Sequence, residues 1–397
     1  MPQNVWFIAA AWMAVALLAS LISIRVGISV ALIEIFCGIV AGNFLHFQTT
    51  EWINFLAMFG AGLLTFLAGA EIDPISLRTH LKPAAAIGVA SFLLPFLGAW
   101  QAAHWIFGWE WRAAQIAGVA LSTTSVAVVY AVMVESRLNE TEIGKLILAA
   151  CFITDFGTVL ALGVLFANFN ASMLVFVAVL AVVLYLLPRF TQEIIQRLGA
   201  TRVSEPEVKF LFLVLFFLGG VATWVKSEAV LPAYLVGLVV AGVFLRNRVL
   251  VHRIRSIAFA LLTPFYFIKA GLYVSLPAVV TGAGIIAALL AVKLVAKGVG
   301  VWPTAGWFRL PRRLNAYTTL LMSTGLTFGT ISALFGFEHG VITQQQYTVL
   351  VTVVILSAVV PTLIAQRWFE PTAEEARFVA GRPPAPVSLE PQRGTDA

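Results

Sequence analysis

Charged residues are scarce in this sequence. Asp, Glu, Lys and Arg make up 11% of its 397 residues, whereas soluble proteins carry about 25%. Hydrophobic residues make up 60%, and the mean hydropathy is +0.94. This composition excludes a soluble globular protein and predicts an all-α polytopic membrane protein. The net charge of +6 therefore indicates cytoplasmic Lys and Arg rather than binding to nucleic acid.

Residues typical of catalysis and of metal binding are also few. The two cysteines, Cys37 and Cys151, lie in apolar runs, which favours buried thiols over a disulfide or a metal site. The five histidines are scattered, and the sequence has no HExxH motif and no Walker loop. No polar stretch is long enough for a nucleotide-binding module. The sequence therefore predicts no enzyme, no ATP-driven pump and no cofactor.

Apolar runs are abundant, and each is near the ~20 residues that a helix needs to cross a bilayer. We predict about thirteen spans: 5–24, 28–45, 52–72, 84–106, 113–135, 143–167, 171–190, 207–226, 230–246, 256–276, 278–302, 313–336 and 345–368. The segment 371–397, rich in Pro, Glu and Arg, is predicted to be a disordered cytoplasmic tail.

The basic residues alternate between the connections of these spans. With the N-terminus outside, 20 of the 25 Lys and Arg fall in the inner connections or the tail, and three fall inside spans. An incorrect number of spans would scramble this alternation. The pattern predicts a multi-pass protein of a bacterial inner membrane, with an external N-terminus and a cytoplasmic C-terminus.

Two pairs of segments indicate an internal repeat. FLAGAEIDPISL (66–77) is similar to FIKAGLYVSLPA (267–278), and LSTTSVAVV (121–129) is similar to MSTGLTFGT (322–330). The members of each pair are seven spans apart, and an odd offset inverts the second copy. Inverted-topology repeats are typical of secondary transporters, which bind their substrate near the bilayer midplane.

Asp155 is the single carboxylate in the apolar run AACFITDFGTVLAL (149–162). A charged Asp at the centre of a span costs roughly 3 kcal/mol, so it is expected to face a water-filled path or a partner. One carboxylate binds a proton or a monovalent cation but not easily both, and this competition is sufficient for cation/proton exchange. The alternative is a structural Asp bonded to a neighbouring helix.

Polar residues interrupt two of the spans, at 122–125 and at 323–330. Ser and Thr can cap broken helix ends, and Gly allows the backbone to unwind. Two broken helices that meet in the bilayer would direct dipole ends and free carbonyls at a cation, whereas the alternative is close packing of small residues. The candidate ion ligands beside Asp155 are Ser122, Thr124, Ser125, Thr154 and, as a further possibility, Thr324.

Several other charged residues fall inside the predicted spans. Lys293 and Lys297 are four residues apart and therefore share one face. One of them could neutralise a broken-helix C-terminus or pair with Asp155, whereas Lys297 could also snorkel to the inner surface. Lys269 is a further candidate, and Glu34 could attract cations in an entrance funnel or form an interhelical ion pair. Glu71 and Asp73 are interpreted as boundary residues.

Five motifs carry a resemblance to a known family. They are EIFCGIVAGNFL (34–45), LTFLAGAEIDP (64–74), LSTTSVAVV (121–129), PFYFIKAGLYVSL (264–276) and LVAKGVGVW (294–302). The chain resembles, over approximately 5–368, the monovalent cation:proton antiporter-2 family, which includes Kef-type and NapA-type sodium or potassium/proton exchangers. The resemblance implies an NhaA/NapA-like fold with two inverted repeats and two crossed discontinuous helices. It also implies Asp155 as the ion-binding acid and Lys297, or Lys293, as the charge-balancing lysine.

The resemblance further implies a homodimer that moves one domain against the other like an elevator. The dimerisation part would comprise 5–72 and 207–276, the core 84–167 and 278–368, and the linker helix 171–190. Electrogenic members have two adjacent acids, whereas Thr154 precedes Asp155 here, which favours electroneutral exchange. The Kef-type regulatory domain has no counterpart in this sequence.

Three alternatives remain open from the sequence. A channel-like potassium efflux protein would need a separate regulatory subunit. A non-transporting sensor would have no reason to retain a costly charge at Asp155. An organic-anion symporter on the same scaffold would need cationic groups at the broken helices and no essential Asp.

Overall fold

The computed structural model describes residues 4–27, 29–70, 72, 79–136, 138, 141–166, 171–198, 205–225, 229–372 and 375. Glu71, Asp73 and almost all of the predicted tail lie outside these ranges. Within them, every regular element is a helix. In a bilayer the helix satisfies its own backbone hydrogen bonds, which accounts for this uniformity.

The described helices of the first half of the chain range from 10 to 28 residues in length. They are α1 (Val5–Val26), α2 (Val30–Phe44), α3 (Glu51–Ala70), α5 (Leu81–Gln101), α6 (Trp111–Ser122), α7 (Val126–Glu135), α8 (Glu142–Leu165) and α9 (Ala171–Leu198). A π-helical turn, Ala102–Ile106, extends α5. α9 continues to Leu198, beyond the predicted end of the linker helix at 190.

The second half begins with α10 (Pro206–Trp224) and α11 (Val230–Arg246). The other helices are α12 (Arg248–Ile257), α13 (Thr263–Leu272), α14 (Leu276–Thr281), α15 (Ala283–Trp307), α16 (Arg312–Met322), α17 (Thr327–Glu338) and α18 (Gln344–Trp368). A second π-helical turn, Ala258–Leu262, joins α12 to α13.

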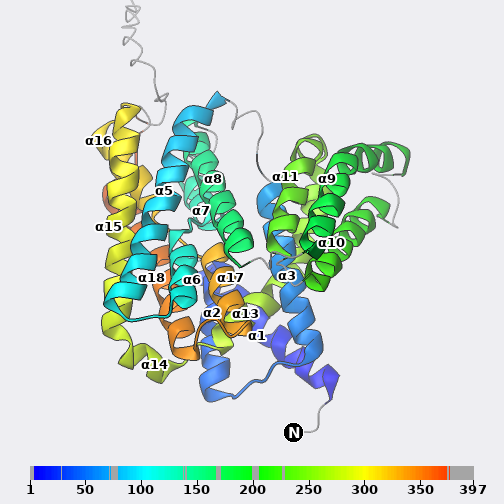
Figure 1. The fold of residues 1–397 in the computed structure, drawn as a ribbon, viewed down its shortest axis with the longest axis horizontal. Coiled ribbons are helices and arrows are strands. Elements are labelled where there is room, and N and C mark those ends of the chain that lie inside the picture. Colours follow the sequence, from blue (N-terminus) through cyan, green and yellow to red (C-terminus); the bar gives the residue numbers. More distant parts are fainter. Residues whose placement is uncertain are drawn as a thin grey trace, which may run out of the picture.

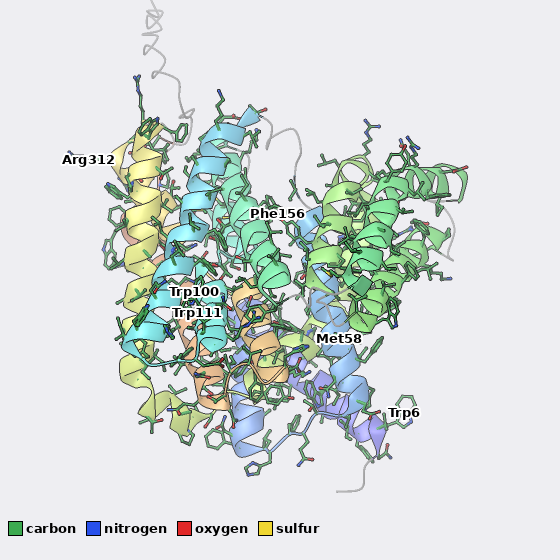
Figure 2. All side chains as sticks on the ribbon, viewed as in Figure 1. Trp6, Met58, Trp100, Trp111, Phe156 and Arg312 are labelled. Carbon is green, nitrogen blue, oxygen red and sulfur yellow. The ribbon has the colours of Figure 1, made fainter. Side chains whose placement is uncertain are left out.

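Eleven of the described helical segments are long and apolar enough to cross a membrane. Two shorter apolar helices, α2 and α11, occupy the other two predicted spans. The prediction of a polytopic all-helical membrane protein is therefore confirmed, while the crossing of the bilayer by all thirteen segments stays a prediction. Trp6, near the start of α1, and Arg312, at the start of α16, lie at opposite ends of the molecule (Figure 2).

The helices pack into two bundles. The core bundle contains α5–α8 and α15–α18, in which α5 packs against α6, α8 and α15. The flanking bundle contains α1–α3 and α9–α13, in which α3 packs against α11 and α2 against α13. Figure 1 shows α15 and α16 at one side of the molecule and α9 and α10 at the other.

Close glycine contacts join the helices of the flanking bundle, and those of Gly271 and Gly237 are examples. A Cβ atom on Gly271 of α13 would lie 2.1 Å from the Ile35 carbonyl oxygen of α2, so only glycine fits. A Cβ atom on Gly237 of α11 would lie 2.0 Å from the Phe66 carbonyl oxygen of α3. In the proposed repeat, α11 corresponds to α2 and α13 corresponds to α3. The contact of α2 with α13 is then equivalent to that of α11 with α3, as a repeat predicts. The inversion of the repeat stays a prediction.

Candidate functional site

Both polar interruptions are breaks between two helices. α6 ends at Ser122 and α7 begins at Val126, and residues 123–125 between them are not helical. α16 ends at Met322 and α17 begins at Thr327. The last carbonyls of α6 and α16 and the first N–H groups of α7 and α17 therefore lack partners within their own helices. Small residues also pack closely at the breaks, since a Cβ atom on Gly329 would lie 2.9 Å from the Ala120 carbonyl oxygen, so the alternative of close packing accompanies the breaks.

The two breaks contact each other. The Thr124 hydroxyl donates a hydrogen bond of 3.0 Å to the carbonyl of Met322, the last residue of α16. The Ser125 N–H donates to the Thr324 hydroxyl at 3.4 Å. These bonds satisfy part of the exposed backbone at each break and join the two interrupted helices at one place in the core bundle.

Asp155 is buried on α8, with a side chain that is 1% exposed. Its Oδ1 atom has no hydrogen-bond partner, and within the described ranges no salt bridge reaches the carboxylate. Asp155 and Lys297 are close enough to interact electrostatically. A buried carboxylate oxygen without a partner is costly, so Asp155 has unused capacity to accept a proton or to coordinate a cation. This geometry does not support a purely structural Asp bonded to a neighbouring helix.

The two lysines of α15 each lie at one break. Lys297 Nζ donates to the hydroxyls of Ser91, at 2.8 Å, and Thr124, at 3.1 Å. Lys293 Nζ donates to Ser357 Oγ at 2.9 Å and lies next to Gly325 in the second break. Both side chains are fully buried, so Lys297 does not extend to the inner surface.

Thr124 connects Lys297 to the end of α16. Its hydroxyl accepts from the ammonium and donates to the Met322 carbonyl. Carbonyls at a helix C-terminus carry partial negative charge, which a nearby cation stabilises. Lys297 therefore acts on the broken-helix C-terminus through one intervening hydroxyl.

The side chains of the other candidate ligands form hydrogen bonds with backbone groups around the breaks. Ser122 Oγ donates to the Val119 carbonyl at 2.8 Å, and Ser125 Oγ accepts from the Val128 N–H at 3.4 Å. Thr324 Oγ1 donates to the Leu321 carbonyl at 2.8 Å. A hydroxyl that donates still has lone pairs, so these oxygens keep the ability to bind a cation.

Thr154 is turned toward α5. Its hydroxyl donates to the Gly88 carbonyl at 3.1 Å and to the Ala150 carbonyl at 3.0 Å. Gly88 permits this approach, since a Cβ atom there would lie 2.8 Å from the Ala150 carbonyl oxygen. The residue that replaces a second acid thus joins α8 to α5.

Lys269 and Glu34 belong to the flanking bundle. Lys269 of α13 forms a salt bridge with Glu338 at the end of α17. Glu34 is buried on α2, and its Oε2 atom has no hydrogen-bond partner. Within the described ranges no salt bridge reaches Glu34, which does not support the alternative of an interhelical ion pair.

The sequence analysis did not identify three residues that contact the site. Ser91 and Ser357 accept hydrogen bonds from the lysines, and isolated serines in apolar helices carry no distinctive signal. Tyr234 of α11 is fully buried, and its hydroxyl donates to the Phe152 carbonyl of α8 at 3.1 Å. Its ring lies 5.9 Å from that of Phe156, which Figure 2 labels on α8.

Comparisons with known proteins identify the family of this chain. The family model described as "Sodium/hydrogen exchanger, transmembrane" matches residues 13–370. A Methanocaldococcus jannaschii protein named "Probable Na(+)/H(+) antiporter 3" is 24% identical over 81% of this chain and 85% of its own length. The Bacillus cereus Na(+)/H(+)-K(+) antiporter GerN is 22% identical over 86% of this chain and 90% of its own length.

A solved structure has the same fold. The sodium proton antiporter MjNhaP1 from Methanocaldococcus jannaschii superposes with a TM-score of 0.71, at 15% identity, over 93% of this chain and all of that chain. The family model covers nearly the whole membrane part, and its match includes both helix breaks and Asp155. The chain therefore belongs to the transmembrane sodium/hydrogen exchanger family, which is a family of transporters.

Proposed function

We propose that this protein is a secondary antiporter that exchanges a monovalent cation, Na⁺ or K⁺, for a proton, with Asp155 as the shared site. The observation that carries the proposal is the buried, unpartnered Asp155 oxygen in the same bundle as two helix breaks that touch. The names of the relatives, which include Na⁺/H⁺ and K⁺ antiporters, point to the same ions.

The cation is bound by oxygen atoms from three sources. Asp155 supplies the charge, and the hydroxyls of Thr124 and Ser125 supply neutral ligands. Carbonyls at the helix breaks complete the shell, and Thr154 supports α8 through its bond to Gly88. Hard monovalent cations prefer such oxygen ligands, and a proton on Asp155 removes the charge that binds them.

The stoichiometry follows from the single carboxylate. Asp155 carries either one proton or one cation, and in this scheme it is the group that takes up and releases the transported proton. Exchange is then one for one and electroneutral, in contrast to relatives that have two adjacent acids.

The transport cycle moves the core bundle relative to the flanking bundle. The two interrupted helices cross where their breaks meet, so that the site travels with the core bundle as in an elevator. The flanking bundle forms the contact of a homodimer in a bacterial inner membrane, with the N-terminus outside. Membership of the antiporter-2 subfamily stays a prediction, which rests on the resemblance of the sequence motifs.

The decisive variant is Asp155→Asn, which has nearly the same size but neither charge nor a titrating proton. We expect it to abolish dissipation of a pH gradient in proteoliposomes on addition of Na⁺, K⁺ or Li⁺. Glu207→Gln is the matched control, because Glu207 is a buried carboxylate of the flanking bundle that pairs with Arg253. Full exchange by Asp155→Asn would contradict the proposal.

A valinomycin clamp in the same assay tests the stoichiometry. One-for-one exchange is insensitive to the clamp, whereas unequal exchange accelerates when K⁺ and valinomycin dissipate the membrane potential. Cation flux without counter-transported protons would instead indicate the channel-like alternative.

A further inference from the structure

Lys269 is a buried lysine outside the ion site. Its side chain on α13 is 4% exposed, and its ammonium pairs with Glu338, whose side chain is 39% exposed. α13 packs against α2 and α3 in the flanking bundle, whereas α17 packs against α6 and α18 in the core bundle. The ion pair therefore joins the two bundles.

Further contacts between the bundles, two of them hydrogen bonds, lie beside this ion pair. The Tyr347 hydroxyl of α18 donates to the Ala270 carbonyl of α13 at 2.6 Å. The Thr348 hydroxyl accepts from the Ser275 N–H at 3.1 Å. The rings of Tyr273 and Phe337 lie 5.1 Å apart. This end of α13 and the turn between α17 and α18 lie at or beside connections predicted to face outside, and α14 and the start of α1 share one end of the molecule (Figure 1).

These contacts differ in kind from those inside the flanking bundle. At Gly271, the backbones of α13 and α2 touch, and the helices can separate only if the bundle comes apart. Between α13 and α17, the described polar contact is made by the ends of two long side chains, Lys269 and Glu338. Rotation of these side chains breaks the contact without moving the backbone of either bundle.

We propose that Lys269 and Glu338 are positioning residues of the transport cycle, and that their ion pair holds the predicted outer end closed until Asp155 opens to that side. The inference rests on the proposed alternating exposure of Asp155. The pair breaks in each cycle, and water that enters the opened end then solvates the lysine. The strength of the pair thereby sets the fraction of molecules whose outer end is open.

A cysteine one turn beyond Asp155 reports this opening. Val159 is 1% exposed and lies four residues after Asp155, on the same face of α8 and nearer the predicted outer end. Val159→Cys, in a background of Cys37→Ala and Cys151→Ala, is treated with a membrane-impermeant maleimide on right-side-out vesicles. Its labelling rate follows the population of the outward-open state and does not require transport.

Three variants test the ion pair in this background. Glu338→Gln removes the charge, Glu338→Lys places two cations together, and Lys269→Glu with Glu338→Lys restores a pair of opposite orientation. We expect Glu338→Gln to raise the labelling rate about fivefold and Glu338→Lys to raise it further, while the exchanged pair returns it close to the starting rate. Glu207→Gln, which breaks an ion pair within the flanking bundle, leaves the rate unchanged.

The outcomes separate this inference from the proposed function. The role of the ion pair would be overturned if both Glu338 variants were labelled at the starting rate. It would also be overturned if the exchanged pair were labelled as fast as Glu338→Lys. If the unmodified protein exchanges ions but the labelling rate does not change in the Glu338 variants, only the role of the ion pair is contradicted. If the labelling rates change as expected but the unmodified protein shows no exchange, the role of the ion pair is supported and the antiporter proposal is contradicted.

Discussion

Replacing Thr124 by Val removes the hydroxyl that joins the two interrupted helices. Val has nearly the same shape as Thr, so the break keeps its packing. The Met322 carbonyl loses its 3.0 Å donor, and Lys297 keeps only its 2.8 Å bond to Ser91. The variant therefore isolates the polar link between α6 and α16.

The size of the effect follows from the two bonds. The bond from Lys297 involves a charged group, and such bonds contribute about 1.5–3 kcal/mol, whereas a neutral bond contributes about 1 kcal/mol. Interhelical hydrogen bonds in membrane proteins average only about 0.6 kcal/mol, because partners are also found in the unfolded state. We therefore expect Thr124→Val to lower the free energy of unfolding by about 2 kcal/mol, with the larger part from the charged bond.

Equilibrium unfolding in mixed micelles measures this free energy, with Thr124→Ser as the control that retains the hydroxyl. A double-mutant cycle with Lys297→Met isolates the coupling, because Thr124 and Lys297 share one hydrogen bond. We expect a coupling of about 1 kcal/mol between them. Unchanged stability of Thr124→Val, or strict additivity with Lys297→Met, would refute the account of the two breaks given above.

Two further predictions concern helix contacts. Gly271→Ala places a methyl group 2.1 Å from the Ile35 carbonyl oxygen, so we expect it to destabilise the protein by about 2 kcal/mol or more in the same unfolding assay. Gly62→Ala, where nothing lies within 4 Å, is the control, and equal stability of the two variants would contradict the close approach. Tyr234→Phe removes the bond to the Phe152 carbonyl and should cost about 1 kcal/mol while leaving the ring in place. A Tyr234→Phe protein as stable as the parent would show that the hydroxyl contributes nothing to the contact between the bundles.

The main features of the site could be predicted because they violate the rules of a membrane helix. A lone Asp155 in an apolar run is costly, and a cluster of Ser and Thr competes with helical hydrogen bonds. Both signals are local in sequence and need no knowledge of packing. The breaks at Ser122 and Met322 therefore occur where the polar residues indicate them.

The contacts between distant segments could not be predicted in the same way. Thr154 and Ile153 of α8 both contact Gly88 of α5 because of how the two helices pack, and sequence alone does not fix that packing. The partner of Lys269 is Glu338, the last residue of α17, where a carboxylate has the pattern of an ordinary surface residue. Ser91 and Ser357 can be recognised as contacts of the site only from the structure, which shows the lysine from which each one accepts a hydrogen bond.

The two buried lysines have a consequence for the effect of membrane voltage on transport. In the proposed cycle Asp155 is neutral when protonated and is neutralised when it holds a monovalent cation, so the buried Lys293 and Lys297 contribute equally to the charge of both loaded forms. A charge that crosses the whole membrane is worth about 2.3 kcal/mol per 100 mV, but equal charges moving in opposite directions cancel. If exchange is one for one, as proposed, voltage alters how fast the core bundle moves in each direction, yet it does not drive net exchange, which is left to the concentration gradients of the two ions.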